Sequence, residues 1–598
     1  MSRPTPPAPA GGRGHPLLRR GLPWLAAGLA AALAALVGAL GLLGGRAAPA
    51  PLAPTDAVVR NATVTIDLPS LPSTLDPWAP DAGPLVGAIL QNVWPGVYDL
   101  APGLRPQLAP GLVQSAEVVG VDPQVVVYHL NPKAVWSDGV PIRADVFVAL
   151  WQHLRADAGY DDIASVQGSD DGLTVTVTFQ TPDAAWPALF DLLPPVPALG
   201  GTGWQDALAP GGPAVEVSGG PFEVASFDPG RQLVLVKNPD WWGPQPALAR
   251  VILDAVPSAT QAVAQVDQGS AQAASPDPFD LALLDAASSA PAVHSTEAIS
   301  PTTLQLVFDT LQGPTAQLPV RAAIAHLVDR PALVQRFLDP LDPSAGVQQN
   351  FFFVGGQAGY QDDGAAYAQP DPTQAAADLQ AAGLTRSPNG PWELGGQPLV
   401  LTLTWAAGDP WAAQFAQAIA GELEADGFAI RAQPVATASL AGHLQPGGTW
   451  DLAVVSVPTP AFPSLLDPLY STQAAPVAGS ALTDWSGFDD PRVDHLLDQA
   501  AAQLNQVQAQ TLTNQADRLL WADLPALPLA SVPRLALWSA SLQGLTLDPG
   551  GGGILDDLAG WQLLRRTALP EVAAGRPRVT AHPAPSADPR SRGRGPAR

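Results

Sequence analysis

The sequence predicts an α/β protein built from more than one lobe. Segments rich in β-branched residues alternate with Ala-rich segments along the chain, a pattern typical of strands connected by helices. No period of roughly 20 to 50 residues repeats, which argues against a solenoid or a propeller. Because 46% of the 598 residues are hydrophobic, the chain is long and apolar enough to fill more than one core.

Seven segments predict strands because runs of Val, Ile, Leu and Thr are bounded by turn-forming residues. They are 125–130, 173–179, 232–238, 249–256, 303–309, 399–405 and 450–457. Five segments predict helices from the spacing of their apolar residues. They are Ala144–Arg155, Val320–Leu338, Gln374–Ala382, Trp411–Asp426 and Pro491–Leu519. The 67 Pro and 56 Gly lie mainly between these segments and predict long, ordered connecting loops.

The N-terminus predicts an export or membrane segment. Residues 1–20 are basic, and residues 21–45 carry no charged side chain. At 1.5 Å per residue, that uncharged run is long enough to cross a hydrocarbon core of ~30 Å. The positive-inside rule then places residues 1–20 in the cytoplasm and the body of the protein outside. We favour a retained transmembrane anchor over a signal segment that is cleaved after export.

Two further segments at the ends of the chain lack the patterns of a folded domain. Residues 46–62 are Ala- and Pro-rich and predict a linker, with the folded body expected to begin near Thr63. Residues 566–598 are rich in Ala, Pro, Arg and Gly without hydrophobic periodicity, which predicts a disordered basic tail.

Composition and charge exclude several functions. A formal net charge of −25 argues against nucleic acid as a partner. The absence of Cys excludes disulfides, Cys-ligated metals and cysteine nucleophiles. The lysines number only two, Lys133 and Lys237, which leaves almost no place for a phosphate-binding P-loop or a Schiff base. The eight His are scattered without ligand-like spacing, so no metal or cofactor is expected.

No catalytic motif stands out in the sequence. The zinc-protease, nucleophile-elbow, dinucleotide-binding and calcium-loop patterns are all missing. Adjacent carboxylates such as Asp170 and Asp171 are frequent, but so acidic a body contains such pairs by chance. We therefore expect a protein that is not an enzyme. A hydrolase of envelope glycans stays a remote alternative, because its two acids need a separation in space that sequence does not show.

A series of short motifs in a fixed order resembles the extracytoplasmic solute-binding proteins of the peptide/nickel class, family 5. The most specific stretch is 104–154, which contains Trp136-Ser137-Asp138-Gly139. Other matching segments are STLDP (73–77), VWPGVYDL (93–100), GPF (220–222), LVKNPDWWG (235–243), VRAAIAHLVDR (320–330) and WDL (450–452). Together the matches extend over residues 63–565, and Trp136 itself is interpreted as a packing anchor before a tight turn.

The resemblance implies a two-lobed, class II periplasmic-binding-protein-like fold with an extra subdomain in lobe I and a cleft between the lobes. Lobe I would comprise 63–308 and lobe II 309–528, with a return to lobe I over 529–565. The segments 306–309 and 529–537 are then candidate hinges. Such a protein is a monomer that captures a small solute by lobe closure and presents it to an ABC permease without breaking a bond.

Two departures from the family pattern affect this interpretation. Relatives are often tethered through a lipid-modified Cys, whereas here any tether has to be the N-terminal segment. Family members that bind peptides also carry an Asp after the WDL strand to pair with the peptide's α-amino group. Here residues 453–462 contain no acid, and the next one is Asp467. Since a dehydrated ammonium without a counter-charge costs several kcal/mol, a free peptide N-terminus is a poor ligand, and a neutral, glycosylated or lipid-like ligand, or none, is favoured. Among small solutes, a peptide-like, neutral or glycolipid ligand therefore stays open.

A glycolipid ligand points to a second interpretation within the same fold. The chain is also similar to an LpqW-like subgroup, whose name refers to binding of monoacyl phosphatidylinositol tetramannoside. That resemblance implies a membrane-tethered envelope protein that acts with a membrane enzyme in phosphatidylinositol mannoside and lipoarabinomannan synthesis. Transport-type solute binding remains the first interpretation, and the LpqW-like role is the alternative.

Eight residues are candidate ligand contacts from their family position and chemistry. They are Leu75, Asp76, Trp94, Tyr98, Trp405, Ser456, Pro458 and Trp485. Trp94 and Tyr98 are expected on a helix and Trp405 at the end of a strand. Tryptophan offers a flat apolar face for a sugar ring or a side chain and an N–H that orients it. Core packing is the competing interpretation for each Trp.

Overall fold

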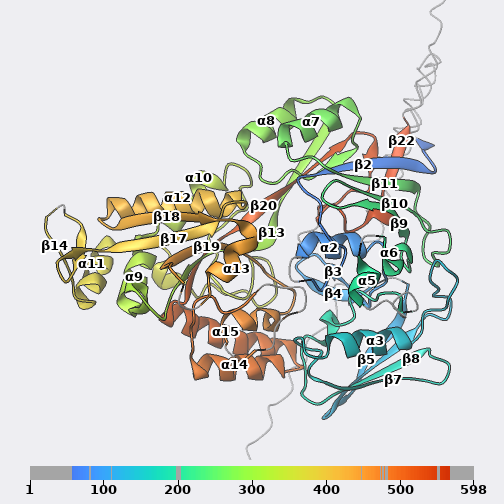
Figure 1. Ribbon diagram of the computed structural model, residues 1–598, viewed down its shortest axis with the longest axis horizontal. Helices are drawn as coiled ribbons and strands as arrows, with labels where there is room; N and C mark the ends of the chain where they lie inside the picture. The colour runs from blue at the N-terminus through green and yellow to red at the C-terminus, as the bar shows by residue number, and fades with distance from the viewer. Residues whose placement is uncertain are drawn as a thin grey trace, which may run out of the picture. The chain divides into compact units, whose positions relative to one another are not determined.

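A mixed ten-stranded sheet forms the centre of the computed structural model (Figure 1). Its strands are β2 (Ala62–Leu68), β9 (Phe222–Asp228), β10 (Gln232–Lys237), β11 (Leu248–Ala255), β12 (Ala273–Ala274), β13 (Val293–Phe308), β17 (Val400–Ala406), β18 (Ala429–Val435), β19 (Leu452–Pro458) and β20 (Ala526–Ser539). They lie in the order β18-β17-β19-β13-β20-β12-β2-β11-β10-β9. The long antiparallel pair β13 and β20 joins the two halves of this sheet.

The structure describes residues 57–565 apart from gaps at 80–81, 110, 197–203, 210, 389, 446–447, 472, 475–476, 478–481 and 548–552. The predicted basic segment 1–20, the segment 21–45, most of the linker 46–62 and the tail 566–598 lie outside the described residues. Within the described part, no helix is long and apolar enough to cross a membrane.

Two hydrophobic cores divide the described residues into two lobes. One core collects Val64, Trp94 and Leu235, and the other collects Leu306 and Phe415. The cores meet at β20, where successive side chains point to opposite faces: Leu535 and Leu537 belong to the second core and Ala536 to the first. We call the elements around the first core the first lobe and those around the second core the second lobe.

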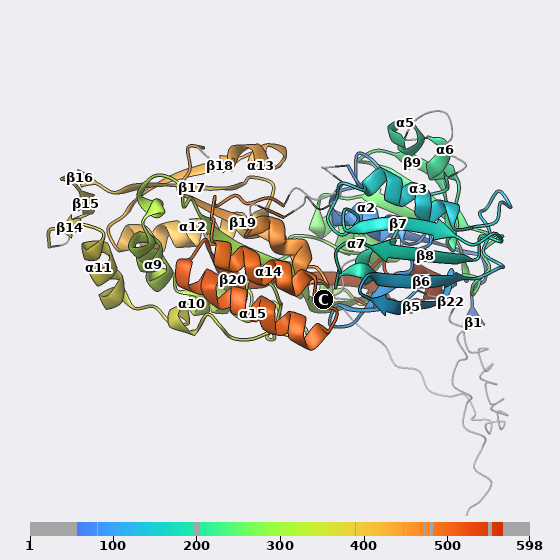
Figure 2. The ribbon, with the colours of Figure 1, turned by 90° about the horizontal axis from the view of Figure 1, so that it is seen from below.

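The first lobe carries a smaller four-stranded sheet besides its share of the central one (Figure 2). Its further elements are α2 (Gly83–Leu90), β3 (Tyr98–Ala101), β4 (Arg105–Leu108), β5 (Val113–Val121), β6 (Gln124–Leu130), α3 (Asp145–Leu154), β7 (Ile163–Gly168), β8 (Thr174–Phe179), η1 (Trp186–Ala188), α5 (Trp204–Leu208) and α6 (Pro213–Glu216). Trp136 is buried before the turn at Gly139, whose φ of +82° needs glycine. The predicted packing role of Trp136 is confirmed.

Helices dominate the second lobe. They are α9 (Leu318–Leu327), α10 (Arg330–Phe337), α11 (Pro372–Ala381), α12 (Pro410–Ala425), α13 (Leu440–His443), η5 (Pro463–Leu469), α14 (Pro491–Ala501) and α15 (Gln506–Asp523). A small sheet joins β14 (Leu384–Arg386), β15 (Trp392–Leu394) and β16 (Gln397–Pro398). Helices α7 (Ala259–Gln268) and α8 (Leu281–Ser289) lie beside β13 and β20 in Figure 1.

All seven predicted strands are present, and three of the five predicted helices appear as single helices. The other two segments each form a pair. Between α9 and α10, Asp329 leaves helical geometry and its side chain accepts from Ala332 N, which starts a new helix. Between α14 and α15, Asn505 does the same for Gln508 N. The apolar spacing continues across each of these capping residues, so the sequence pattern alone predicts one long helix where the structure has two.

Three edge strands bring the ends of the described chain together. They are β1 (Ala57–Val58), β21 (Leu542–Gln543) and β22 (Gln562–Arg565), in the order β1-β22-β21. Paired backbone therefore begins at Ala57, inside the predicted linker. The candidate hinge 529–537 lies within β20, and the candidate hinge 306–309 covers the end of β13 and the next residue, Asp309. The predicted lobe boundaries at 308 and 528 stay predictions.

Candidate ligand-binding site

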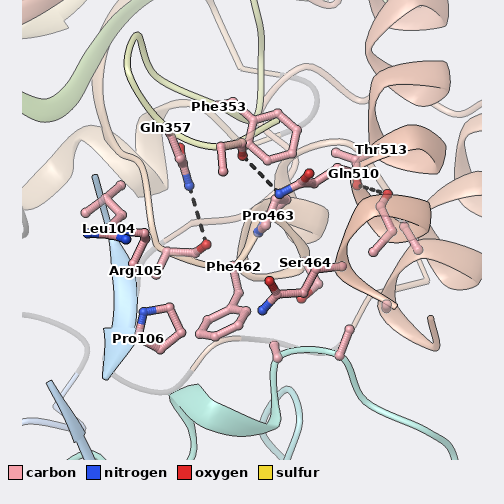
Figure 3. A pocket seen from close by; sticks show the side chains of 18 of the residues that line it. Leu104, Arg105, Pro106, Phe353, Gln357, Phe462, Pro463, Ser464, Gln510 and Thr513 are labelled. Carbon is pink, nitrogen blue, oxygen red and sulfur yellow. Dashed lines mark hydrogen bonds between the residues drawn. The ribbon is translucent and has the colours of Figure 1, made fainter. Parts of the chain in front are cut away.

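A pocket between the two lobes is the principal candidate site (Figure 3). It encloses about 110 Å³. Its lining is Gly103, Leu104, Arg105, Pro106, Ala184 and Ala185 from the first lobe, and Phe353, Gln357, Ala358, Ala461, Phe462, Pro463, Ser464, Asp467, Leu497, Ala500, Ala501, Gln506, Ala509, Gln510 and Thr513 from the second. Small and apolar side chains make most of the surface, with a few amides, hydroxyls and charges among them, as is usual for sites that bind organic solutes.

The first lobe contributes the tip of a hairpin. Strands β3 and β4 pair from Tyr98 with Leu108 to Ala101 with Arg105. Gly103 and Leu104, in the turn between them, have φ values of +79° and +58°, so the tip is a tight reversal. This turn reaches the second lobe, because a Cβ built on Gly103 would lie 3.6 Å from the carbonyl oxygen of Gly356.

A second segment of the first lobe, Ala184 and Ala185, is held by a buried polar contact. Asp183 N donates to Gln124 Oε1 at 2.7 Å, and Gln124 Nε2 donates back to Asp183 O at 3.1 Å. The Asp183 carboxylate accepts from Ala185 N at 2.7 Å. Ala184 N then donates to Ala501 O of the second lobe at 2.7 Å, which joins the lobes directly at the pocket.

The second lobe contributes a helical wall and two loops. Gln510 Nε2 on α15 donates to Ala358 O at 3.2 Å, and Gln357 Nε2 donates to Ala461 O at 3.4 Å. Figure 3 shows these bonds joining the loop at Phe353 to the helix and to the segment before η5. The wall is therefore built from pieces more than 100 residues apart in the chain.

Two charged side chains line the pocket. Arg105 comes from the hairpin of the first lobe and is exposed, and its Nε donates to Pro102 O at 3.2 Å. Asp467 comes from η5 of the second lobe, where it is 9% exposed. Burial, together with Asp498 and Asp494 on α14, holds the pKa of the Asp467 carboxyl well above its ordinary value. Within the described residues, no group of three or more acidic, His or Cys side chains is arranged to hold a metal ion.

Residues 107–476 match the sequence profile of the bacterial extracellular solute-binding proteins, family 5. The chain belongs to this family. The match takes in more than half of the chain and continues across both lobes. The members of this family are extracellular solute-binding proteins.

Two relatives agree with that assignment, and a solved structure shares the fold. The oligopeptide-binding protein OppA of Mycobacterium tuberculosis is 28% identical over 468 residues, which cover 75% of this chain and 76% of OppA. The probable monoacyl phosphatidylinositol tetramannoside-binding protein LpqW of the same species is 33% identical over 276 residues, 42% of this chain and 41% of LpqW. The periplasmic EDTA-binding protein EppA superposes with a TM-score of 0.78 at 24% identity, covering 85% of this chain and 98% of EppA. The two-lobed fold predicted from the sequence is confirmed.

The four candidate contacts in the first lobe lie around its core and do not line the interlobe pocket. Leu75 and Trp94 are buried, and Trp94 stacks on Trp78 with ring centroids 6.3 Å apart. Asp76 is half-buried and accepts from Trp78 N at 3.0 Å. Tyr98 packs edge-on against Trp186 at 5.6 Å.

The prediction that Trp94 and Tyr98 lie on a helix is wrong. Helix α2 ends at Leu90, and Tyr98 begins strand β3. Pro95 and Gly96 separate the two residues, and Pro removes the backbone N–H that a continuing helix would use.

The four candidates in the second lobe are separated from one another. Trp405 lies near the end of β17, as predicted, and is buried. Ser456 donates to the Asp409 carboxylate at 2.5 Å, and Pro458 is exposed. Trp485 is buried beside a small cavity that Tyr470 also lines. None of these four lines the interlobe pocket, and their part in ligand binding stays a prediction.

The residues that do line the pocket carry little sequence signal. Ala461 and Phe462 fall within residues 453–462, the segment that contains no acid, and Asp467 follows it. The hairpin tip is indicated by Pro102-Gly103, a turn pair, but a turn pair does not indicate a binding site. The Ala and Gln residues of α14 and α15 look like any Ala-rich helix.

Proposed function

We propose that this protein captures an oligopeptide-type solute in the interlobe pocket and delivers it to an ABC permease. The similarity to OppA carries the proposal, because it extends over three-quarters of both chains. The pocket chemistry is compatible with a peptide: amides from Gln357, Gln506 and Gln510 can serve peptide groups, and Phe462 and Leu497 offer apolar surface.

A ligand screen on the full-length protein in mild detergent tests this proposal. We would record thermal unfolding with peptides of two to ten residues, sugars, polyamines and inositol-mannoside glycolipids. A ligand at 100 times its Kd adds about 2.7 kcal/mol to the free energy of unfolding, so a binder is readily seen. Stabilisation by peptides, confirmed by calorimetry, is the expected result. A response to glycolipid with none to any peptide would replace this function with the alternative below.

The alternative is an LpqW-like role in envelope biosynthesis, with a membrane enzyme as partner. It is favoured by the higher identity to LpqW, 33%, although this applies to less than half of either chain. A glycolipid ligand should then stabilise the protein, and the genes for a permease and an ATPase should be dispensable for its action.

We further propose that the N-terminal segment holds the protein at the outer face of the cell membrane. The uncharged run 21–45 after a basic start supports this. Fractionation of cells should recover the full chain with membranes, and a variant with Leu33→Asp and Leu40→Asp in the run should lose that association. Recovery of a soluble form whose first residue follows position 46 would show cleavage instead.

A further inference from the structure

One loop of the second lobe forms a wall of the interlobe pocket and lies against helix α15. This pocket loop, residues 349–363, contributes Phe353 and Gln357 to the lining, and α15 contributes Ala509 and Thr513. The loop contains no helix or strand of its own. Its position, and with it the shape of the pocket, therefore depends on the bonds that attach it to α15.

Hydrogen bonds from one face of α15 attach the pocket loop. Asn514 Nδ2 donates to Gly359 O at 2.8 Å, and Phe351 N donates to Asp517 Oδ1 at 2.6 Å. Residues three and four apart lie on the same face of a helix, so both bonds continue the line begun by Gln510, which donates to the loop from one turn earlier. The loop is thus attached along about two turns of α15.

A buried pair of carboxyl groups, Asp363 and Asp517, lies at the end of this attachment. Asp517 is buried, and the side chain of Asp363 is 13% exposed. Gly364 packs so closely on Trp521 of α15 that no Cβ would fit, which presses the end of the loop against the helix. Asp363 Oδ2 and Asp517 Oδ2 are both buried and accept from no donor among the described residues.

The two carboxyl groups are close enough to form a hydrogen bond with each other. A carboxylate oxygen only accepts, so such a bond needs a proton on one of the two groups. Without that proton, two buried negative charges would repel. Burial and the neighbouring Asp363 hold the pKa of Asp517 well above its ordinary value, although the bond from Phe351 N opposes the rise. One proton between the two groups therefore replaces a repulsion by a bond.

Three other titratable side chains face the pair. Arg518 Nη1 lies 3.6 Å from Asp363 Oδ1, but its side chain is 49% exposed, so water weakens the attraction. Tyr360 and Tyr470 face Asp517. Burial raises the pKa of Tyr360 to about 12 and raises that of Tyr470 as well, so both phenols stay neutral where a carboxyl group titrates.

We propose that Asp363 and Asp517 share one proton, that this proton fastens the pocket loop to α15, and that its loss frees this wall of the pocket. The pair is then a pH-sensitive fastening built into the second lobe. Release of a bound solute as the pH rises is its consequence, and that consequence rests on the proposed function, whereas the shared proton does not.

The direction of the pH effect follows from proton linkage. When the loop leaves α15, both carboxyl groups reach water and regain an ordinary pKa of about 4. Between that value and the raised pKa of the closed pair, opening of the loop releases a proton. The population of the open loop then rises about tenfold for each pH unit. A higher pH therefore loosens the wall, and a lower pH holds it in place.

The test is hydrogen–deuterium exchange with mass spectrometry on the full-length protein in mild detergent. Exchange is followed from about pH 5 to about pH 8 and corrected for the intrinsic effect of pH on amide exchange. In wild type, the protection of peptides from 349–363 should fall by up to about tenfold per pH unit. In Asp363→Asn it should change less than about threefold over the whole range, because the amide donates to Asp517 without a shared proton.

Two further variants control the measurement. Arg518→Gln removes only the half-exposed ion pair and should keep the wild-type pH dependence. Asp517→Asn keeps an acceptor for Phe351 N and should flatten the profile as Asp363→Asn does, so it carries the test if Asp363→Asn fails to fold. Two independent protons would instead leave part of the pH dependence in each of these single variants.

Two results of the exchange experiment would overturn the inference. One is a protection of 349–363 in wild type that does not change with pH. The other is a pH dependence that survives in both Asp363→Asn and Asp517→Asn. Neither result touches the proposed function, because a solute can bind to a pocket whose wall is fixed.

Calorimetry with the tripeptide Ala-Phe-Ala at the two ends of the pH range tests the consequence for binding. The affinity should be at least tenfold higher at the lower pH in wild type and change less than about threefold in Asp363→Asn. An affinity that stays constant while the protection changes would contradict release by the fastening. A pH-dependent loop in a protein that binds neither this tripeptide nor any other peptide supports the shared proton and contradicts the oligopeptide function.

Discussion

The aromatic cluster of the first lobe and the interlobe pocket differ in almost every respect that a sequence displays. This cluster consists of the aromatic side chains at the first-lobe core, among them the stacked pair Trp78 and Trp94 and the edge-on pair Tyr98 and Trp186. Aromatic residues of this kind suggest a sugar or peptide site. The pocket is lined largely by Ala, Gln, Ser and Pro. Yet the cluster packs on a hydrophobic core, and the pocket lies between the lobes. In this protein the aromatic side chains that stand out in the sequence stabilise the fold. Small and polar side chains that do not stand out form the pocket surface that a solute can reach.

Among the variants that test this comparison, Trp94→Ala is expected to change the free energy of unfolding most. Trp94 is 1% exposed, so its removal leaves a cavity and should lower the free energy of unfolding by about 3–5 kcal/mol. Denaturant unfolding measures the loss, and calorimetry on the folded fraction should find the Kd of an identified ligand unchanged. A weaker Kd at unaltered stability would make Trp94 a ligand contact and reverse the comparison.

The next effect concerns pH and the wall of the pocket. Burial raises the pKa of Asp183 to about 7, and the bond from Ala185 N opposes only part of that rise. The folded state then binds more protons than the unfolded state between the two pKa values, so the free energy of unfolding falls as pH rises from about 4 to 7. At ~1.4 kcal/mol per pKa unit, the fall is at most about 4 kcal/mol.

Asp183→Asn should flatten that dependence, because Asn still accepts from Ala185 N without carrying a charge. Urea unfolding at a series of pH values measures it. Asp228→Asn is the control, since Asp228 is exposed in an ion pair with Arg231. An unchanged slope in the Asp183 variant would mean that the acid titrates at its ordinary pKa.

A smaller effect is expected from filling the pocket. Ala509→Phe places a ring on the face of α15 that lines it. The affinity for the identified solute should fall at least tenfold, about 1.4 kcal/mol, while the free energy of unfolding changes by less than about 0.5 kcal/mol. This is the reverse of the pattern expected for Trp94→Ala. An unaltered Kd would place the solute elsewhere in the protein.

The smallest effect is expected from Ser456→Ala. It removes the hydroxyl that donates to Asp409, whose carboxylate also accepts from Ala412 N at the start of α12. A loss of about 1 kcal/mol in the free energy of unfolding should follow. Ser464→Ala in the pocket lining is the matched control and should change stability by less than about 0.5 kcal/mol. A loss of affinity in Ser456→Ala without a loss of stability would restore Ser456 as a ligand contact.

The sequence by itself determined the fold class, the strands and most of the helices. Runs such as 399–405 and 450–457 strongly favour strands, because their β-branched side chains suit a pleated surface buried on both faces. The order of the short motifs also indicated the family. Residues such as Trp136 and Gly139 are required by local packing and by tight turns, so they can be recognised from the sequence without the tertiary structure.

Only the tertiary structure decided where the pocket lies and which residues line it. Its walls come from the turn at Gly103, the segment at Ala184, the loop at Phe353 and the helices α14 and α15, which are far apart in the chain. Whether a buried Asp finds a backbone donor depends on neighbours that no local pattern specifies: Asp517 accepts from Phe351 N, which lies 166 residues away in the chain. Burial and proximity are properties of the packed chain, whereas propensity and turn formation belong to short segments of it.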